Sequence, residues 1–194
     1  MIFCLQIKEF YMYSRPQPLP LKEIAQQFKK KLEKIKLFIS DVDGVLTNSE
    51  IFWIGGEAGW ARKFNTQDGY GLKILKRNGV QVAILSGGDS KGLVERINNL
   101  QIDLYELGDE NKSHGFNSIV KKTGLALEQI LYVGDEFFDL PILEQVGFSA
   151  TPPHSSIEIQ EAVDYVTFRE GGKGCVRELV DLVCYAQNID LKSL

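Results

Sequence analysis

Residues 36–47 contain the feature that most constrains this chain, a short apolar run that ends in two closely spaced aspartates. The apolar residues at 37–39 are too few for the core face of a helix, and Gly44 follows them as a turn residue. The pattern therefore predicts a buried strand with Asp41 and Asp43 at its carboxyl end. This is the edge at which open α/β sheets bind their ligands.

The spacing of Asp41 and Asp43 indicates a chemical role. Side chains alternate along a strand, so both carboxylates leave the sheet on one side, where they repel each other unless a cation or a proton lies between them. Oxygen ligands of this kind suit Mg²⁺. One carboxylate can attack phosphorus, and the other can protonate a leaving alcohol and later activate water. The alternative for an isolated Asp-x-Asp is a turn whose carboxylates cap a helix or bind water.

Strands and helices alternate along the rest of the chain. Apolar runs predict further strands at 80–85, 102–107, 130–133, 148–150 and 165–167, and helical periodicity predicts helices at 21–34, 68–78, 91–99, 111–123 and 176–186. This alternation predicts an α/β fold of the Rossmann-like three-layer α/β/α type with a mostly parallel sheet.

Two segments precede or interrupt this alternation. We expect residues 1–34 to form an N-terminal arm and helix, and residues 35–194 to form the main domain. Within that domain, residues 48–64 read as a β-hairpin inserted after the aspartate loop, which we call the flap. Its aromatic residues need covering, which suggests a partner subunit.

Polar residues follow three more of the predicted strands. Ser86, Gly87 and Gly88 come between a strand and a helix, where a hydroxyl and glycine amides can hold an anion. Lys112 lies in the first turn of a helix, where the helix dipole disfavours a cation. We therefore expect it to pair with a negatively charged group. Asp135 follows the strand at 130–133 and can complete a magnesium site with Asp41.

Several other candidates receive less specific interpretations. Asp139 can support the metal site from behind it, and Lys173, within a glycine-rich loop at 171–174, can contact substrate or simply turn the chain. His114 and His154 have no partner at ligand spacing, so structural roles are expected for both.

Composition excludes several function classes. A formal charge of −4 argues against nucleic acid as the main partner. Three cysteines at irregular spacing indicate neither a disulfide framework nor a zinc site. No apolar stretch is long enough to span a membrane, and the apolar residues at 1–5 are interrupted too early for a signal peptide. A cytoplasmic protein without membrane partners is therefore expected.

The segment Asp-Val-Asp-Gly-Val-Leu-Thr at 41–47, with the later polar residues in order, resembles the four motifs of the haloacid dehalogenase (HAD) superfamily over roughly residues 35–187. The small insertion resembles that of a capless member. The stretches at 64–71, 86–90 and 171–178 are similar to those of the 3-deoxy-D-manno-octulosonate 8-phosphate (KDO 8-phosphate) phosphatase family.

This resemblance implies a Mg²⁺-dependent phosphatase of lipopolysaccharide sugar synthesis that forms an aspartyl-phosphate and assembles as a homotetramer, with flaps helping to close active sites. It implies Asp41 as nucleophile and Asp43 as acid and base, with the Asp43 backbone carbonyl as a third metal ligand. Ser86 and Lys112 would contact the phosphate or balance its charge. The implied substrate-binding residues are Arg62, Asp68, Gly87, Gly88 and Lys173.

Two positions depart from the family pattern. Gln67 and Gly88 stand where the family usually has arginine, which suits carboxylate or phosphate binding. Arg62, Lys63 or Lys173 could supply the missing cation.

Two alternatives stay open. One is a phosphatase for a related nine-carbon keto-sugar-acid phosphate, and the other is a HAD-like module kept for assembly without catalysis. A dinucleotide-binding protein is disfavoured, because no Gly-x-Gly-x-x-Gly follows the first strand.

Overall fold

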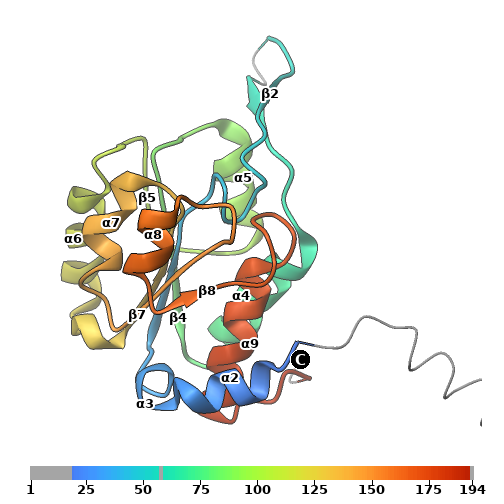
Figure 1. The fold of residues 1–194 in the computed structure, drawn as a ribbon. Coiled ribbons are helices and arrows are strands. Elements are labelled where there is room, and N and C mark those ends of the chain that lie inside the picture. The colour runs from blue at the N-terminus through green and yellow to red at the C-terminus, as the bar shows by residue number, and fades with distance from the viewer. Residues whose placement is uncertain (1–18, 57–58, 193–194) are drawn as a thin grey trace, which may run out of the picture.

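A six-stranded parallel sheet forms the centre of the protein (Figure 1). The structure is a computed structural model that describes residues 19–56 and 59–192. The predicted arm at residues 1–18 lies outside the described residues. The strands run in the order β5-β4-β1-β6-β7-β8, each parallel to its neighbours. Their bounds are β1 Leu37–Ser40, β4 Gln81–Ser86, β5 Leu104–Leu107, β6 Ile130–Val133, β7 Phe148–Thr151 and β8 Tyr165–Val166.

Helices lie on both faces of this sheet, as predicted. They are α2 Leu21–Gln27, α3 Lys29–Leu32, α4 Thr66–Arg77, α5 Lys91–Asn99, α6 Lys112–Thr123, α7 Leu140–Leu143, α8 Ile157–Ala162 and α9 Cys175–Gln187, with 3-10 turns η1 Leu127–Gln129 and η2 Phe137–Asp139. None of the helices in the described part of the chain combines the length and apolar character that crossing a bilayer requires.

Alternation along β1 divides the apolar core into two layers. Phe38 points to the layer that contains buried residues of α2, α4, α5 and α9. Leu37 and Ile39 point to the other layer, with buried residues of α6, α7 and α8. All four residues of β1 are buried, as expected for a central parallel strand covered by helices on both faces. The three-layer α/β/α prediction is confirmed.

The strand order explains where a site can form. The chain builds β1, β4 and β5 toward one edge and then returns to place β6 on the other side of β1. The loops after β1 and β6 therefore diverge at a topological switch point, which is the usual ligand-binding crevice of such sheets.

The N-terminal helical segment differs from the prediction. The expected single helix at 21–34 is interrupted at Phe28, which separates α2 from α3. The Phe28 ring packs edge-on against Phe148 and Tyr165, with centroid distances of 5.3 and 6.1 Å. Residues of α2 share the core of the main domain, mainly against α9. The domain division at residue 34 stays a prediction.

The flap contains the two-stranded antiparallel sheet formed by β2 Phe52–Trp53 and β3 Trp60–Ala61. It projects away from the body of the protein (Figure 1). Trp53 and Trp60 stack edge-to-face at 5.4 Å, yet they remain 58% and 49% exposed. Their exposure on a projecting hairpin agrees with the expectation that this surface needs covering.

Candidate active site

Asp41 lies immediately beyond β1, where the backbone is fixed by the neighbouring strand. Its N–H donates to the carbonyl of Val133 at the end of β6, at 3.0 Å. The residue is only 3% exposed, so its carboxylate is removed from bulk water. Burial raises the pKa of the Asp41 carboxyl, the Lys112 ammonium opposes this shift, and the carboxylates of Asp139 and Asp135 reinforce it.

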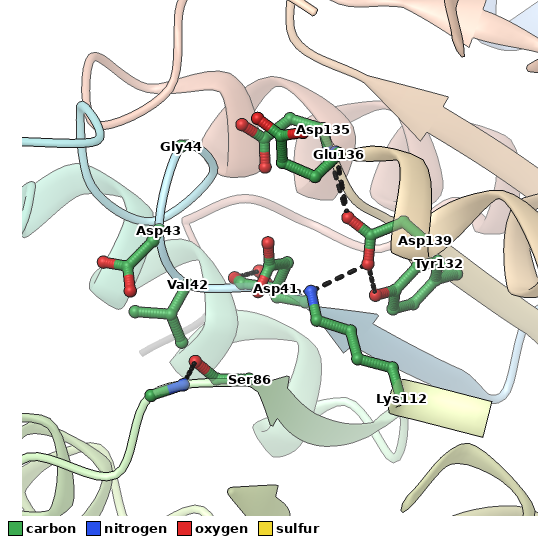
Figure 2. Close-up of polar contacts among 12 residues, drawn as sticks. Asp41, Val42, Asp43, Gly44, Ser86, Lys112, Tyr132, Asp135, Glu136 and Asp139 are labelled. Atoms are coloured by element: carbon green, nitrogen blue, oxygen red, sulfur yellow. Dashed lines mark hydrogen bonds and ion pairs between the residues drawn. The ribbon is translucent and has the colours of Figure 1, made fainter. Parts of the chain in front are cut away.

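Lys112 supplies the positive charge of the cluster (Figure 2). Its Nζ lies 2.8 Å from Asp41 Oδ1 and 2.7 Å from Asp139 Oδ1, and the side chain is 1% exposed. Burial acts to lower the pKa of Lys112, but the two carboxylates outweigh it and the net shift is upward. Lys112 is therefore positively charged, and its position beside Asp41 agrees with the expectation that it pairs with a negatively charged group.

Asp139 holds the cluster together and has little capacity left for a further ligand. Oδ1 accepts from Lys112 Nζ and from the Tyr132 hydroxyl. Oδ2 accepts the backbone N–H groups of Asp135 and Glu136, both at 3.1 Å. With both oxygens fully used, Asp139 orients Lys112 and the 134–136 loop, which is the supporting position expected from the sequence.

Asp135 is the carboxylate that is free to bind a cation. It is 6% exposed, its Oδ1 is buried without a hydrogen-bond partner among the described residues, and its Oδ2 lies 3.2 Å from His154 Nε2. One ligand oxygen from each of Asp41, Asp135 and Asp139 lies within 4.8 Å of the others. Because Asp139 is already committed, we assign the direct contacts to Asp41 and Asp135.

Gly44 allows Asp135 to approach the loop after β1. It has a φ of +88°, and a Cβ added there would lie 1.8 Å from Asp135 Oδ2. Any side chain at this position would therefore displace the carboxylate. A glycine that first appeared to be only a turn residue thus also leaves room for the metal ligand.

We define the inner cluster as Asp41, Lys112, Asp135 and Asp139. Its net charge would be balanced by a divalent cation. Three carboxylates and one ammonium leave two negative charges in a buried site. Buried charge of this kind needs compensation, and carboxylate oxygens are the ligands that Mg²⁺ takes. The residues present therefore fit such an ion, with the Asp43 backbone carbonyl as the third contact that the family resemblance implies.

Ser86 lies at the end of β4, the direct neighbour of β1, so its hydroxyl faces the same rim of the sheet (Figure 2). It is 2% exposed, and its Oγ accepts the N–H of Gly88 at 3.1 Å. The hydroxyl hydrogen stays available to an oxygen in the site. Gly87 and Gly88 lie between Ser86 and the start of α5, and their role in holding an anion stays a prediction.

The Asp43 side chain points away from the inner cluster and contacts the flap (Figure 2). Arg62, the residue after β3, binds it through two hydrogen bonds, Nε to Oδ1 at 2.6 Å and Nη2 to Oδ2 at 2.8 Å. Arg62 Nη1 also donates to Ser90 Oγ at 2.8 Å. The Asp43 side chain is 38% exposed, so this second site is wetter than the inner one.

Two of the predicted substrate-binding residues pair with groups outside the inner cluster. Asp68 is fully buried, and its Oδ1 accepts the Arg177 N–H at 2.7 Å at the start of α9. Burial raises the pKa of Asp68 to about 6. Lys173 is exposed and pairs with Glu170 at 2.6 Å. In this arrangement both side chains serve local structure.

Sequence reasoning missed two residues of the site. Tyr132, inside β6, donates to Asp139, and burial followed by the nearby carboxylates raises its pKa well above the usual value. His154 was expected to have a purely structural role, yet it contacts Asp135, whose hydrogen bond raises the pKa of the imidazole. His154 follows the carboxyl end of β7, and that position could have identified it.

Comparison with known proteins agrees with this geometry. Residues 71–147 match the family model of haloacid dehalogenase-like hydrolases. A KDO 8-phosphate phosphatase, KdsC, from Haemophilus influenzae is 41% identical over 160 residues, which cover 82% of this chain and 88% of the relative. This chain belongs to the KDO 8-phosphate phosphatase family.

Solved structures of KDO 8-phosphate phosphatases have the same fold. The enzyme from Moraxella catarrhalis, in complex with magnesium, phosphate and KDO, has a TM-score of 0.80 and 34% identity, covering 84% of this chain and 93% of its own. A cobalt-bound enzyme from Haemophilus influenzae has a TM-score of 0.78 and 38% identity, covering 84% and 96%. The resemblance read from the motifs is therefore confirmed at the level of the family.

Proposed function

We propose that this protein is a Mg²⁺-dependent phosphomonoesterase that hydrolyses KDO 8-phosphate in lipopolysaccharide sugar biosynthesis. Membership of the family supports the substrate, and the named relatives support the reaction class. The single observation that carries the chemistry is the inner cluster. A buried nucleophilic carboxylate lies beside a lysine, and the neighbouring Asp135 Oδ1 has no partner of its own.

The proposed roles follow from the requirements of phosphoryl transfer, in which positioning and charge stabilisation dominate. Asp41 attacks phosphorus and becomes transiently phosphorylated. Lys112 balances charge on the nucleophile and the phosphoryl group, and Ser86 donates to a phosphoryl oxygen. Asp43 protonates the leaving oxygen and later takes a proton from the attacking water.

The metal would be held by the side chains of Asp41 and Asp135 and by the Asp43 carbonyl. When bound, Mg²⁺ would offset negative charge on the phosphoryl oxygens. Asp139 and Tyr132 orient the lysine on one side of this site, and His154 contacts Asp135 on the other. These contacts hold Lys112 and Asp135 in position around the proposed cation.

We also propose that the protein acts in the cytoplasm as a homotetramer in which the flaps help to close active sites. The exposed apolar residues of the flap, from Ile51 to Ile54 together with Trp60, support an interface there. Light scattering of the full chain tests the assembly. A monomer at micromolar concentration would contradict it, and Trp53→Ser with Trp60→Ser should shift a tetramer toward smaller species.

Phosphate release from a panel of substrates tests the function. The panel compares KDO 8-phosphate with a nine-carbon keto-sugar-acid phosphate, in Mg²⁺ and in EDTA. We expect the eight-carbon substrate to give the higher kcat/KM, and EDTA to remove turnover. A preference for the nine-carbon compound would identify it as the substrate, the alternative considered because Gln67 and Gly88 depart from the family pattern. A lack of turnover across the panel would favour an assembly module.

A further inference from the structure

The guanidinium of Arg62 lies beside Gly88, in the loop that follows β4. A Cβ added to Gly88 would lie 2.7 Å from Arg62 Nη2. The missing side chain at 88 therefore leaves room for a guanidinium that comes from the flap. The Arg62 side chain is only 8% exposed, although it comes from a projecting hairpin.

The same guanidinium engages the proposed acid and base of the reaction. Both Asp43 oxygens accept hydrogen bonds from Arg62, and the third nitrogen is held by Ser90. While this pair is intact, three of the five guanidinium N–H groups are used, and both Asp43 oxygens are directed at Arg62. The reaction assigned to Asp43 requires at least one oxygen to be free for the leaving group or for water.

We propose that Arg62 is the specificity-determining residue that recognises the substrate's carboxylate, and that this recognition releases Asp43 for catalysis. The inference rests on the proposed function. The Nε–Nη2 edge of the guanidinium pairs with one carboxylate at a time in bidentate geometry, so a substrate carboxylate at this edge competes with Asp43 for Arg62. The Asp43 side chain is 38% exposed, so water or a substrate can reach it and replace its contact with Arg62, whereas those of Lys112 and Asp139 in the inner cluster are at most 1% exposed.

Two substrates separate recognition from general catalysis. KDO 8-phosphate has a carboxylate, and glucose 6-phosphate lacks one. In Arg62→Gln, kcat/KM for KDO 8-phosphate should fall about tenfold or more relative to kcat/KM for glucose 6-phosphate, as expected for the loss of a bidentate charged contact. The matched control is Lys91→Gln, an exposed cation that follows Ser90 at the start of α5. A parallel fall on both substrates, or no change on either, would overturn the proposal.

Binding of free KDO, which has the carboxylate but no phosphate, tests Arg62 without any turnover. Calorimetry should show binding to the wild type and binding weaker by about tenfold to Arg62→Gln. Equal binding to both would overturn the inference even if the phosphatase activity is confirmed. Conversely, absent phosphatase activity with Arg62-dependent KDO binding would reject the proposed reaction while leaving the recognition role intact.

A swap of the arginine provides a second variant. Gly88→Arg alone places a side chain against Arg62, so we expect reduced activity on KDO 8-phosphate. The double variant Gly88→Arg with Arg62→Ala should recover the preference for KDO 8-phosphate over glucose 6-phosphate relative to Arg62→Ala alone. Circular dichroism and melting curves confirm that each variant folds, and a folded double variant with no recovered preference would count against the proposal.

Discussion

The two aspartates of one motif, Asp41 and Asp43, lie in opposite environments only two residues apart. Asp41 belongs to a buried cluster in which Lys112 is fixed by two carboxylates and by the ring of Phe138. Asp43 is more exposed and meets an arginine from the flap. The comparison teaches that the charge used for attack on phosphorus is built into the core. The charge that controls the acid and base comes from a peripheral hairpin.

The largest expected effect comes from removing the nucleophile. Asp41→Asn keeps the shape of the side chain but cannot form the aspartyl-phosphate, so kcat on KDO 8-phosphate should fall by about a thousandfold or more. Phosphate release under saturating substrate measures it. Activity within tenfold of the wild type would assign the attack to another group and remove the distinction between the two aspartates.

Stability should separate the inner cluster from surface pairs. Lys112→Met leaves Asp41 and Asp139 buried without their cation, so unfolding free energy in EDTA should fall by about 3–5 kcal/mol. The control Lys122→Met breaks an exposed pair with Glu106 and should lose less than about 1 kcal/mol. Urea unfolding measures both, and similar losses would show that burial does not distinguish these lysines.

Asp68 is a buried carboxylate that accepts a backbone N–H, whereas Asp41 pairs with the ammonium of Lys112. The pKa of Asp68 is raised from 3.8 to about 6, mainly by burial, so its stabilising contribution is complete at low pH and is lost as pH rises through 6. Between pH 7.5 and 4.5, the wild type should gain on the order of 2 kcal/mol relative to Asp68→Asn. Urea titrations at both pH values test this, and parallel pH dependence would contradict it.

Gly44 tests how closely Asp135 must approach the loop of Asp41. Gly44→Ala should weaken Mg²⁺ binding by about tenfold or more, since its Cβ would meet Asp135 Oδ2. Gly79 has a similar φ of +83° but nothing within 4 Å of an added Cβ, so Gly79→Ala should share the backbone strain and leave Mg²⁺ affinity unchanged. Calorimetry distinguishes the two, and equal Mg²⁺ affinities would contradict the assignment.

The smallest effect is expected at the outer pair. Arg62→Gln should change unfolding free energy by less than about 1 kcal/mol, because Asp43 is partly hydrated and the pair is exchangeable. Urea unfolding measures this loss against that of Lys112→Met. A loss as large as that of Lys112→Met would show that Arg62 is a fixed structural residue and would erase the contrast between the two aspartates.

Much of the inner cluster was predictable because strand ends in a parallel sheet converge. Asp41, Ser86 and Asp135 each follow an apolar run, and the order of β1, β4 and β6 brings those ends to one rim. Lys112 was suggested by its unfavourable place in a helix first turn. These inferences need only the period of the sequence and the geometry of the sheet.

The remaining features of the site and the fold depend on contacts between distant segments, which a local sequence pattern does not reveal. The contact of Arg62 with Asp43 depends on the path of the flap. The burial of Asp68 depends on how α4 packs against α9. The break at Phe28 reflects its packing on Phe148, although helical periodicity continues through it. Two further helices, α7 and α8, were missed because four and six residues are too short to show a period.

A crystal structure with Mg²⁺, beryllium trifluoride and KDO tests the central claim most directly. Beryllium trifluoride mimics a phosphoryl group on aspartate. We expect that it binds Asp41, that one Mg²⁺ contacts both Asp41 and Asp135, and that Arg62 moves from Asp43 to the KDO carboxylate. An ion bound away from Asp135, or a fluoride adduct on Asp43, would contradict the fixed inner site on which the account depends.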